Sequence, residues 1–176
     1  MPSQGDICVN FDGGARPNPG ECYGGAVVYE WIDSKWVVQW ELGYNGEDDY
    51  ENRGTNNIGE YEGLILGLKK VAGYQDRHIT IEGDSQLVIR QCKGEWNCSS
   101  NSIAYLYDEA RHKLRGLERQ NYVRLKWVPR DENECADALA EEAWRSGSFS
   151  RFVGNSNNNA NYYSSSDSSS SSSDDY

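Results

Sequence analysis

The chain has 176 residues, of which 37% are hydrophobic, and its mean hydropathy is −0.82. This length suits one domain that is large enough to bury a core. No apolar run approaches the roughly 18 residues of a membrane-spanning helix, which argues against a membrane protein. The formal net charge of −11 argues against binding to nucleic acid through bulk electrostatics.

The N-terminal segment, residues 1–6, has neither the basic nor the apolar part of a signal peptide. We therefore expect an intracellular protein that is not secreted. The five cysteines, at positions 8, 22, 92, 98 and 135, include no CxxC pair. We expect reduced thiols, without a disulfide framework or a zinc site. We also expect a monomer.

Composition divides the chain into two parts. Residues 5–152 carry the alternating and helical apolar patterns of one folded domain. Residues 153–176 consist mostly of Asn, Ser, Tyr and Asp, and they cannot bury enough apolar surface to offset the entropy of the chain. We predict that this second part is a disordered tail.

The folded part reads as βββαβααβα. Strands over residues 7–12, 24–31 and 36–42 predict an antiparallel meander, which is followed by an acidic loop at 46–52. Apolar side chains at helical spacing then predict a helix that begins near residues 55–57. Next come a strand (78–84), a short helix (85–91), a loop (93–101), a longer helix (103–117), a strand (122–128) and a last helix. This order indicates an α/β domain in which helices connect parallel strands.

Four carboxylates hold special positions in this layout. Asp12 and Asp84 each end a strand, and the carboxyl ends of parallel strands are where α/β proteins bind ligands. Glu60 falls in the first turn of its helix, and Asp137 falls in the first turns of the last one. Ordinary alternatives are a solvated turn or an Asx-turn at Asp12, a capping box from Asn57 to Glu60, and a favourable helix dipole at Asp137.

Taken together, the four acids favour a metal site. Converging carboxylates without basic partners repel each other, and divalent cations are the usual compensation. Oxygen ligands without a nearby His or Cys favour Mg²⁺ or Mn²⁺ over Zn²⁺. All-carboxylate sites typically perform two-metal phosphoryl transfer. Glu62 points away from Glu60 on the same helix, and we expect it to be solvated.

Four sequence blocks resemble, in order, those of type 1 ribonuclease H. They are residues 12–20, 55–62, 83–88 and 128–140, and the resemblance covers residues 6–147. It implies a five-stranded mixed sheet, with three antiparallel and two parallel strands, flanked by helices. It also implies an endoribonuclease that hydrolyses the RNA strand of RNA/DNA hybrids and leaves 5′-phosphate and 3′-hydroxyl ends.

The resemblance assigns roles to the four acids. Asp12, Glu60, Asp84 and Asp137 match the family's metal ligands, and Asp12 would bridge two Mg²⁺ ions, for which Mn²⁺ can substitute.

The resemblance also implies substrate contacts. Asn18, Asn56, Asn57 and Gln86 match positions in the minor groove of the hybrid, where 2′-hydroxyls distinguish RNA from DNA, and Thr55 matches a contact to a DNA phosphate. Gly13 and Gly14 would let the substrate backbone come close. The ordinary alternatives are a Pro-rich turn for Asn18 and a helix N-cap for Thr55 or Asn56.

The chain departs from the family pattern in two places. The loop before the last helix is short and lacks the His of many members; Arg130 is the nearest substitute, able to contact a phosphate but not to act as a base. Its alternative is a salt bridge with Asp131 or Glu134. Residues 93–101 lack the basic protrusion that grips the DNA strand. These departures leave open a nuclease acting mainly on double-stranded RNA, or a hybrid-binding module without catalysis.

Overall fold

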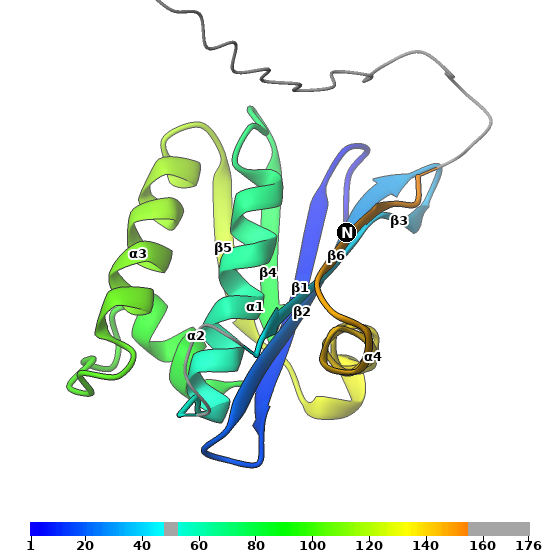
Figure 1. Cartoon of the computed structure of the whole chain (residues 1–176). Coiled ribbons are helices and arrows are strands. Elements are labelled where there is room, and N and C mark those ends of the chain that lie inside the picture. Colours follow the sequence, from blue (N-terminus) through cyan, green and yellow to red (C-terminus); the bar gives the residue numbers. More distant parts are fainter. Residues whose placement is uncertain (48–52, 155–176) are drawn as a thin grey trace, which may run out of the picture.

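The computed structural model describes residues 1–47 and 53–154. One mixed sheet runs through the middle of the domain, and helices lie on both of its faces (Figure 1). The tail predicted at 153–176 falls outside the described residues except for its first two positions, and most of the acidic loop at 46–52 falls outside them as well. The division into one domain and a disordered tail stays a prediction.

The described part of the chain forms six strands in the order β5-β4-β1-β2-β3-β6. They are β1 (Ile7–Arg16), β2 (Glu21–Ile32), β3 (Lys35–Gly46), β4 (His78–Gly83), β5 (Tyr122–Trp127) and β6 (Phe149–Phe152). β1, β2 and β3 form an antiparallel meander, and β4 and β5 extend the sheet from β1 in parallel. The predicted α/β class, with a meander and two parallel strands, is confirmed.

The sheet has one strand more than the five that were predicted. β6 pairs antiparallel with β3, from Trp40↔Phe152 to Gly43↔Phe149. Its four residues are Phe, Ser, Arg and Phe, so neither its length nor its apolar pattern separates it from a loop. β6 covers the free edge of β3, and Arg151 holds it there through ion pairs to Glu41 and Glu142.

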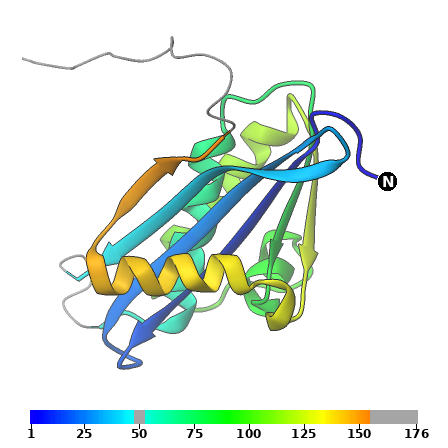
Figure 2. The same ribbon diagram turned by 90° about the vertical axis from the view of Figure 1, so that its right-hand side faces the viewer.

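Four α-helices complete the described domain: α1 (Asn56–Val71), α2 (Gln86–Cys92), α3 (Ala104–Glu118) and α4 (Glu134–Ser146). α1 packs on β1 and β2 and also on α3, and these two helices cover one face of the sheet. α4 crosses β2 and its neighbours on the opposite face (Figure 2). The main core lies between α1 and the sheet, where Val9, Phe11 and Leu64 are almost fully buried.

Two further features concern the chain as a whole. Among the helices of the described residues, none is both long and apolar enough to cross a membrane. All five cysteines are free thiols, and Cys8, Cys22 and Cys92 are buried.

β1 does not end at Asp12, as the sequence predicted. It continues to Arg16 in antiparallel register with β2, and only its parallel pairing with β4 stops near that point, at Phe11↔Gly83. Asp12 therefore lies within a paired strand, one residue beyond the place where β1 and β4 part. The solvated-turn alternative for Asp12 is wrong, because the residue is buried and paired with Gly25.

The glycine after Asp12 has a role different from the predicted one. A methyl group on Gly13 would overlap the backbone of Gly59 in α1, and one on Gly63, about a turn further along α1, would overlap the carbonyl oxygen of Asp12. The missing side chains therefore let α1 lie backbone to backbone on β1. At Gly13, α1 of the protein itself occupies the space in which the substrate backbone was expected.

Gly63→Ala tests this close packing. The added methyl group would meet a backbone carbonyl that cannot rotate away, so we expect the free energy of unfolding to fall by about 1–3 kcal/mol. Gly116→Ala in α3 is the matched control, because no atom beyond the surrounding backbone of its own helix lies within 4 Å of the added methyl group. We expect this control to gain up to about 1 kcal/mol, since Ala is the better helix former. Urea denaturation measures both, and undiminished stability of Gly63→Ala would contradict the packing described above.

Candidate active site

Four acidic side chains from four different elements meet at one end of the sheet. Asp12 lies on β1, Glu60 on α1, Asp84 directly after β4, and Asp137 on α4. This is the end at which α1 and α2 begin, at the lower side of Figure 1. The convergence that the sequence predicted depends on β1 and β4 being parallel neighbours, which brings Asp12 close to Asp84.

Asp12 is the most buried of the four acids, with 8% of its surface exposed. Its Oδ1 accepts a hydrogen bond of 2.8 Å from the backbone N–H of Gly13. Asp84 is half-buried, and its backbone is fixed from β5, because the indole Nε1 of Trp127 donates to its carbonyl oxygen at 3.0 Å. Both carboxylates are therefore carried by backbone that the sheet holds in place.

Glu60 lies in the second turn of α1, not in its first turn as predicted. The N-cap of this helix is Thr55, whose hydroxyl accepts a hydrogen bond from the backbone N–H of Ile58 at 3.4 Å. The capping-box alternative from Asn57 to Glu60 is therefore wrong. The side chain of Glu60 instead reaches α2, where Ser85 Oγ donates to its Oε2 at 2.8 Å. Glu60 is thus held beside Asp84, the residue that precedes Ser85.

Asp137 lies in the first turn of α4, as predicted. Its backbone N–H donates to the carbonyl oxygen of Asn133 at 3.1 Å, at the start of the helix. A favourable interaction with the helix dipole is compatible with this position. Asp137 also lies close enough to Asp12 to raise the pKa of the Asp12 carboxyl group.

The electrostatics of the site reflect buried negative charge. Burial is the main cause that raises the pKa of Asp12 to about 8, and the charges of Asp84 and Asp137 raise it further against the lowering effect of the Gly13 N–H. Burial also raises the pKa of Glu60 to about 7, with a smaller contribution from Asp84 against the Ser85 hydroxyl. Within residues 1–47 and 53–154, the ion pairs of lysine and arginine go to other acids. No ion pair within these residues therefore compensates the charge at the site.

The chemistry of these residues fits a hard divalent cation. All four donors are carboxylate oxygens, and a buried cluster of acids without a cationic partner is stabilised by a metal ion. As the side chains stand, no three His, Cys, Asp or Glu side chains of the described residues are gathered into a group that could enclose one ion. The four carboxylates are therefore suitable ligands for Mg²⁺ or Mn²⁺, but their side chains are not already arranged around one ion.

Three predicted substrate contacts lie together beside the site. Asn56 Oδ1 accepts a hydrogen bond of 2.9 Å from the backbone N–H of Ala15, and Asn18 Oδ1 accepts one of 3.3 Å from the backbone N–H of Asn56. These bonds join the turn between β1 and β2 to the N-terminus of α1, where Thr55 is the cap. The N-cap alternative is confirmed for Thr55 and wrong for Asn56.

The remaining predicted contacts line the same end of the domain. Asn57 lies in the first turn of α1, and Gln86 is the exposed first residue of α2, directly after Asp84 and Ser85. A methyl group on Gly14 would come within 2.8 Å of the hydroxyl of Tyr23. Arg130 is exposed on a short 3-10 helix, η1 (Arg130–Glu132). The described residues provide no ion pair to Asp131 or Glu134, so the salt-bridge alternative for Arg130 is wrong.

Both histidines lie away from the acids. His78 begins β4, at the opposite end of that strand from Asp84, and its ring packs against Tyr122 with 5.2 Å between the ring centroids. His112 is exposed on α3. Sequence reasoning missed two buried residues of the site instead, Ser85 and Asn133. Both fall inside recognised blocks, but only the folded chain reveals their partners.

Comparison with known proteins places this chain in a family. Residues 10–143 match a family model described as reverse transcriptase-like. The bifunctional protein Rv2228c of Mycobacterium tuberculosis is 34% identical over 137 residues, which are 78% of this chain and 35% of that protein. Ribonuclease HI of Halobacterium salinarum is 36% identical over 140 residues, 79% of this chain and 64% of the relative. The chain thus spans about a third of the length of the mycobacterial relative.

Solved structures agree with these relatives. Ribonuclease H1 of Halobacterium salinarum aligns with a TM-score of 0.66 at 35% identity, covering 80% of this chain and 98% of that one. LC11-RNase H1, whose structure was solved in complex with RNA/DNA hybrid, aligns with a TM-score of 0.67 at 26% identity, covering 80% and 97%. With the matched family model, the six-stranded mixed sheet and the four convergent acids, the chain belongs to the type 1 ribonuclease H family.

Proposed function

We propose that this domain is a metal-dependent endoribonuclease that hydrolyses the RNA strand of RNA/DNA hybrids. The observation that carries the proposal is that four carboxylates lie near the point where β1 and β4 part, without an ion pair to a cation among the described residues. A structural role does not account for such a group, because buried like charges destabilise the fold. The ribonuclease H relatives support the reaction and the substrate.

In this proposal Asp12, Glu60, Asp84 and Asp137 hold Mg²⁺, with Mn²⁺ as a substitute. Two bound ions would supply Lewis-acid activation of a water and stabilisation of the leaving 3′ oxygen, so that products carry 5′-phosphate and 3′-hydroxyl ends. The chain itself contributes orientation. Asp12 is fixed by β1 and the Gly13 N–H, and Glu60 is fixed by the hydroxyl of Ser85.

Substrate recognition is assigned to the N-termini of α1 and α2. Asn18, Asn56 and Asn57 surround the start of α1, and Gln86 starts α2, so amide groups can reach the 2′-hydroxyls of the minor groove. The N-terminus of α1 at Thr55 suits a phosphate of the DNA strand, because the helix dipole favours negative charge there. Amide contacts of this kind do not depend on net charge, which is consistent with an acidic protein that binds nucleic acid.

Double-stranded RNA is the second candidate substrate. Arg90 lies in the last turn of α2 and Lys93 directly after this helix, and Glu95 pairs with both, at 3.1 and 3.6 Å. These cations are therefore neutralised by a neighbour, which weakens any dedicated grip on a DNA strand. A hybrid-binding module without catalysis is the third candidate, but the four acids argue against it, since carboxylates repel a polyanion.

A cleavage panel with two carboxylate variants tests the function. We expect wild type with Mg²⁺ or Mn²⁺ to cut an RNA/DNA hybrid faster than double-stranded RNA, and not to cut single-stranded RNA or DNA. Glu60→Gln and Asp84→Asn should lose roughly a thousandfold in rate, because each removes a proposed metal ligand.

Glu62→Gln is the matched control for that panel, as it removes a carboxylate two residues from Glu60 on the same helix, and we expect it to keep wild-type activity. Full activity of Asp84→Asn would refute the ligand assignment. Hybrid binding without turnover in either metal would favour the binding module. A faster rate on double-stranded RNA would make double-stranded RNA the main substrate and would leave the proposed two-metal hydrolysis unchanged.

Asp12→Asn tests the electrostatic strain of the metal-free site. The pKa of Asp12 is about 8 in the folded protein, above its ordinary value of 3.8. The free energy of unfolding of the metal-free protein therefore falls as pH rises between these two values. We therefore expect Asp12→Asn to stabilise the metal-free protein by roughly 1–3 kcal/mol at pH 8 and by much less near pH 4. Chemical denaturation in EDTA at both pH values measures this difference.

The control for this variant is Asp108→Asn, which changes an exposed carboxylate on α3. We expect it to leave stability nearly unchanged at either pH. Added Mg²⁺ should raise the unfolding temperature of wild type more than that of Asp12→Asn. A destabilised Asp12→Asn protein at pH 8 would show that the carboxylate is satisfied within the fold.

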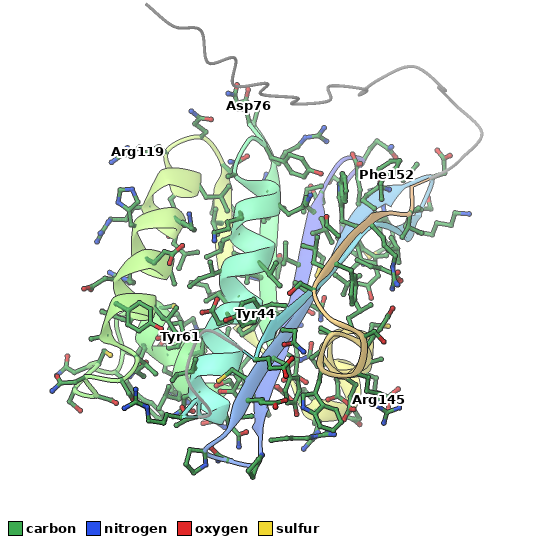
Figure 3. All side chains as sticks on the ribbon, in the orientation of Figure 1. Tyr44, Tyr61, Asp76, Arg119, Arg145 and Phe152 are labelled. Atoms are coloured by element: carbon green, nitrogen blue, oxygen red, sulfur yellow. The ribbon has the colours of Figure 1, made fainter. Side chains whose placement is uncertain are left out.

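Arg130→Ala tests whether the arginine contacts the substrate. Because this exposed guanidinium has no ion pair among the described residues, it can meet a phosphate, and its loss should raise KM several-fold and weaken the salt dependence of binding. Arg119→Ala is the control, since this exposed arginine lies at the opposite end of the domain from the site (Figure 3). Equal KM values for both variants would remove Arg130 from the substrate interface.

A further inference from the structure

Asn133 is a buried polar residue that the four carboxylates do not explain. It lies between η1 and α4, and only 1% of its surface is exposed. Its side-chain Nδ2 donates a hydrogen bond of 2.9 Å to the backbone carbonyl oxygen of Phe11. A buried amide is tolerated only when it is hydrogen-bonded, and this one is bonded to the strand that carries Asp12.

The position of Phe11 explains why an amide is needed there. Phe11 is the last residue of β1 in register with β4, opposite Gly83, and the next residue of β1 is Asp12. Where two strands part, a backbone carbonyl loses its neighbour in the sheet and requires another donor. The side chain of Asn133 supplies that donor, in place of a further strand.

The same residue is bonded to the helix that carries Asp137. The backbone carbonyl oxygen of Asn133 accepts from the N–H of Asp137 at 3.1 Å. Asn133 therefore binds the residue before Asp12 with its side chain and binds Asp137 with its backbone.

A second amide holds Asn133 in this orientation. Asn10 Nδ2 lies 3.4 Å from Asn133 Oδ1 and donates to Glu82 Oε2 at 3.3 Å, while Asn10 Oδ1 accepts from Cys8 Sγ at 3.3 Å. These contacts assign the oxygen and nitrogen of the Asn133 amide, because the oxygen faces a donor and the nitrogen faces an acceptor. The network crosses from β4 through β1 to the start of α4.

We infer that Asn133 is a positioning residue of the active site, which sets Asp137 against Asp12 for metal binding. This inference rests on the proposed function. Groups that orient metal ligands without touching the metal commonly change metal affinity or activity by about 10–100-fold when they are removed. The alternative is an amide that serves only the fold.

Asn121 provides the matched control for that alternative. Its Nδ2 donates to the carbonyl oxygens of Tyr74 and Leu117, at 2.7 and 3.1 Å, and its Oδ1 accepts from the N–H of Arg77 at 3.0 Å. It therefore makes the same kinds of bonds as Asn133, but it lies just before β5, at the opposite end of that strand from the acids.

The experiment compares Asn133→Ala, Asn133→Ser and Asn121→Ala with wild type, well below their unfolding temperatures. We expect Asn133→Ala to lower kcat on a hybrid by about 10–100-fold at nearly unchanged KM, and to weaken Mg²⁺ binding in calorimetry by about tenfold. Asn133→Ser keeps a hydroxyl donor and should recover part of both losses. Asn121→Ala should lose stability while keeping wild-type kcat and Mg²⁺ affinity.

If Asn133→Ala does not fold, Asn10→Ala serves instead, because it removes the contact to Asn133 Oδ1 and leaves the bond to Phe11; we expect a smaller loss in the same two quantities. Wild-type kcat and Mg²⁺ affinity in a folded Asn133 or Asn10 variant would overturn the inference. A wild type that binds Mg²⁺ without cutting hybrids would refute the proposed function alone, since the Mg²⁺ affinities still decide the role of Asn133.

Discussion

The close approach of α1 to β1 is the constraint on which the site depends. A helix normally stands off a sheet by the thickness of its side chains, but here Gly13, Gly59 and Gly63 leave nothing between the two backbones. Glu60 lies on the helical turn that this contact fixes, and Asp12 lies on the strand beneath. On the other face Gly25 admits α4 in the same way, against Ala136 and Ala140. α1 and α4 are thus held close to the backbone of β1 and β2, on opposite faces of the sheet.

The rigid backbone holds the acids together against their electrostatic repulsion. Acids that repel one another would move apart if the backbone allowed it, and burial makes their ionisation still less favourable. The stability of the fold must therefore come from elsewhere, chiefly from the core between α1 and the sheet. Hydrogen bonds at Ser85 and Asn133 then orient groups that the core has already brought together.

The sequence predicted the element order correctly as far as α4, because apolar periodicity is a local signal, and short polar blocks singled out the four acids. It could not predict β6, whose pairing depends on a free strand edge far away in the chain. It placed the end of β1 at Asp12, before two glycines, whereas the strand continues to Arg16 and Gly13 lets α1 approach. The contacts of Asn133 could not be predicted for the same reason, because its partner Phe11 lies in a strand far away in the sequence.

The net charge of −11 becomes understandable from where the cations lie. Many are paired with acids on the described surface: Arg151 with Glu41 and Glu142, and both Arg90 and Lys93 with Glu95. Such pairs leave little free positive charge for general attraction to a polyanion. Under the proposed function, recognition rests on a few directed contacts from amides at helix N-termini, and specificity comes from the shape and hydroxyls of the substrate. We therefore expect such a domain to bind its substrate weakly and to release it readily, with selectivity that depends on how the substrate fits at the acids.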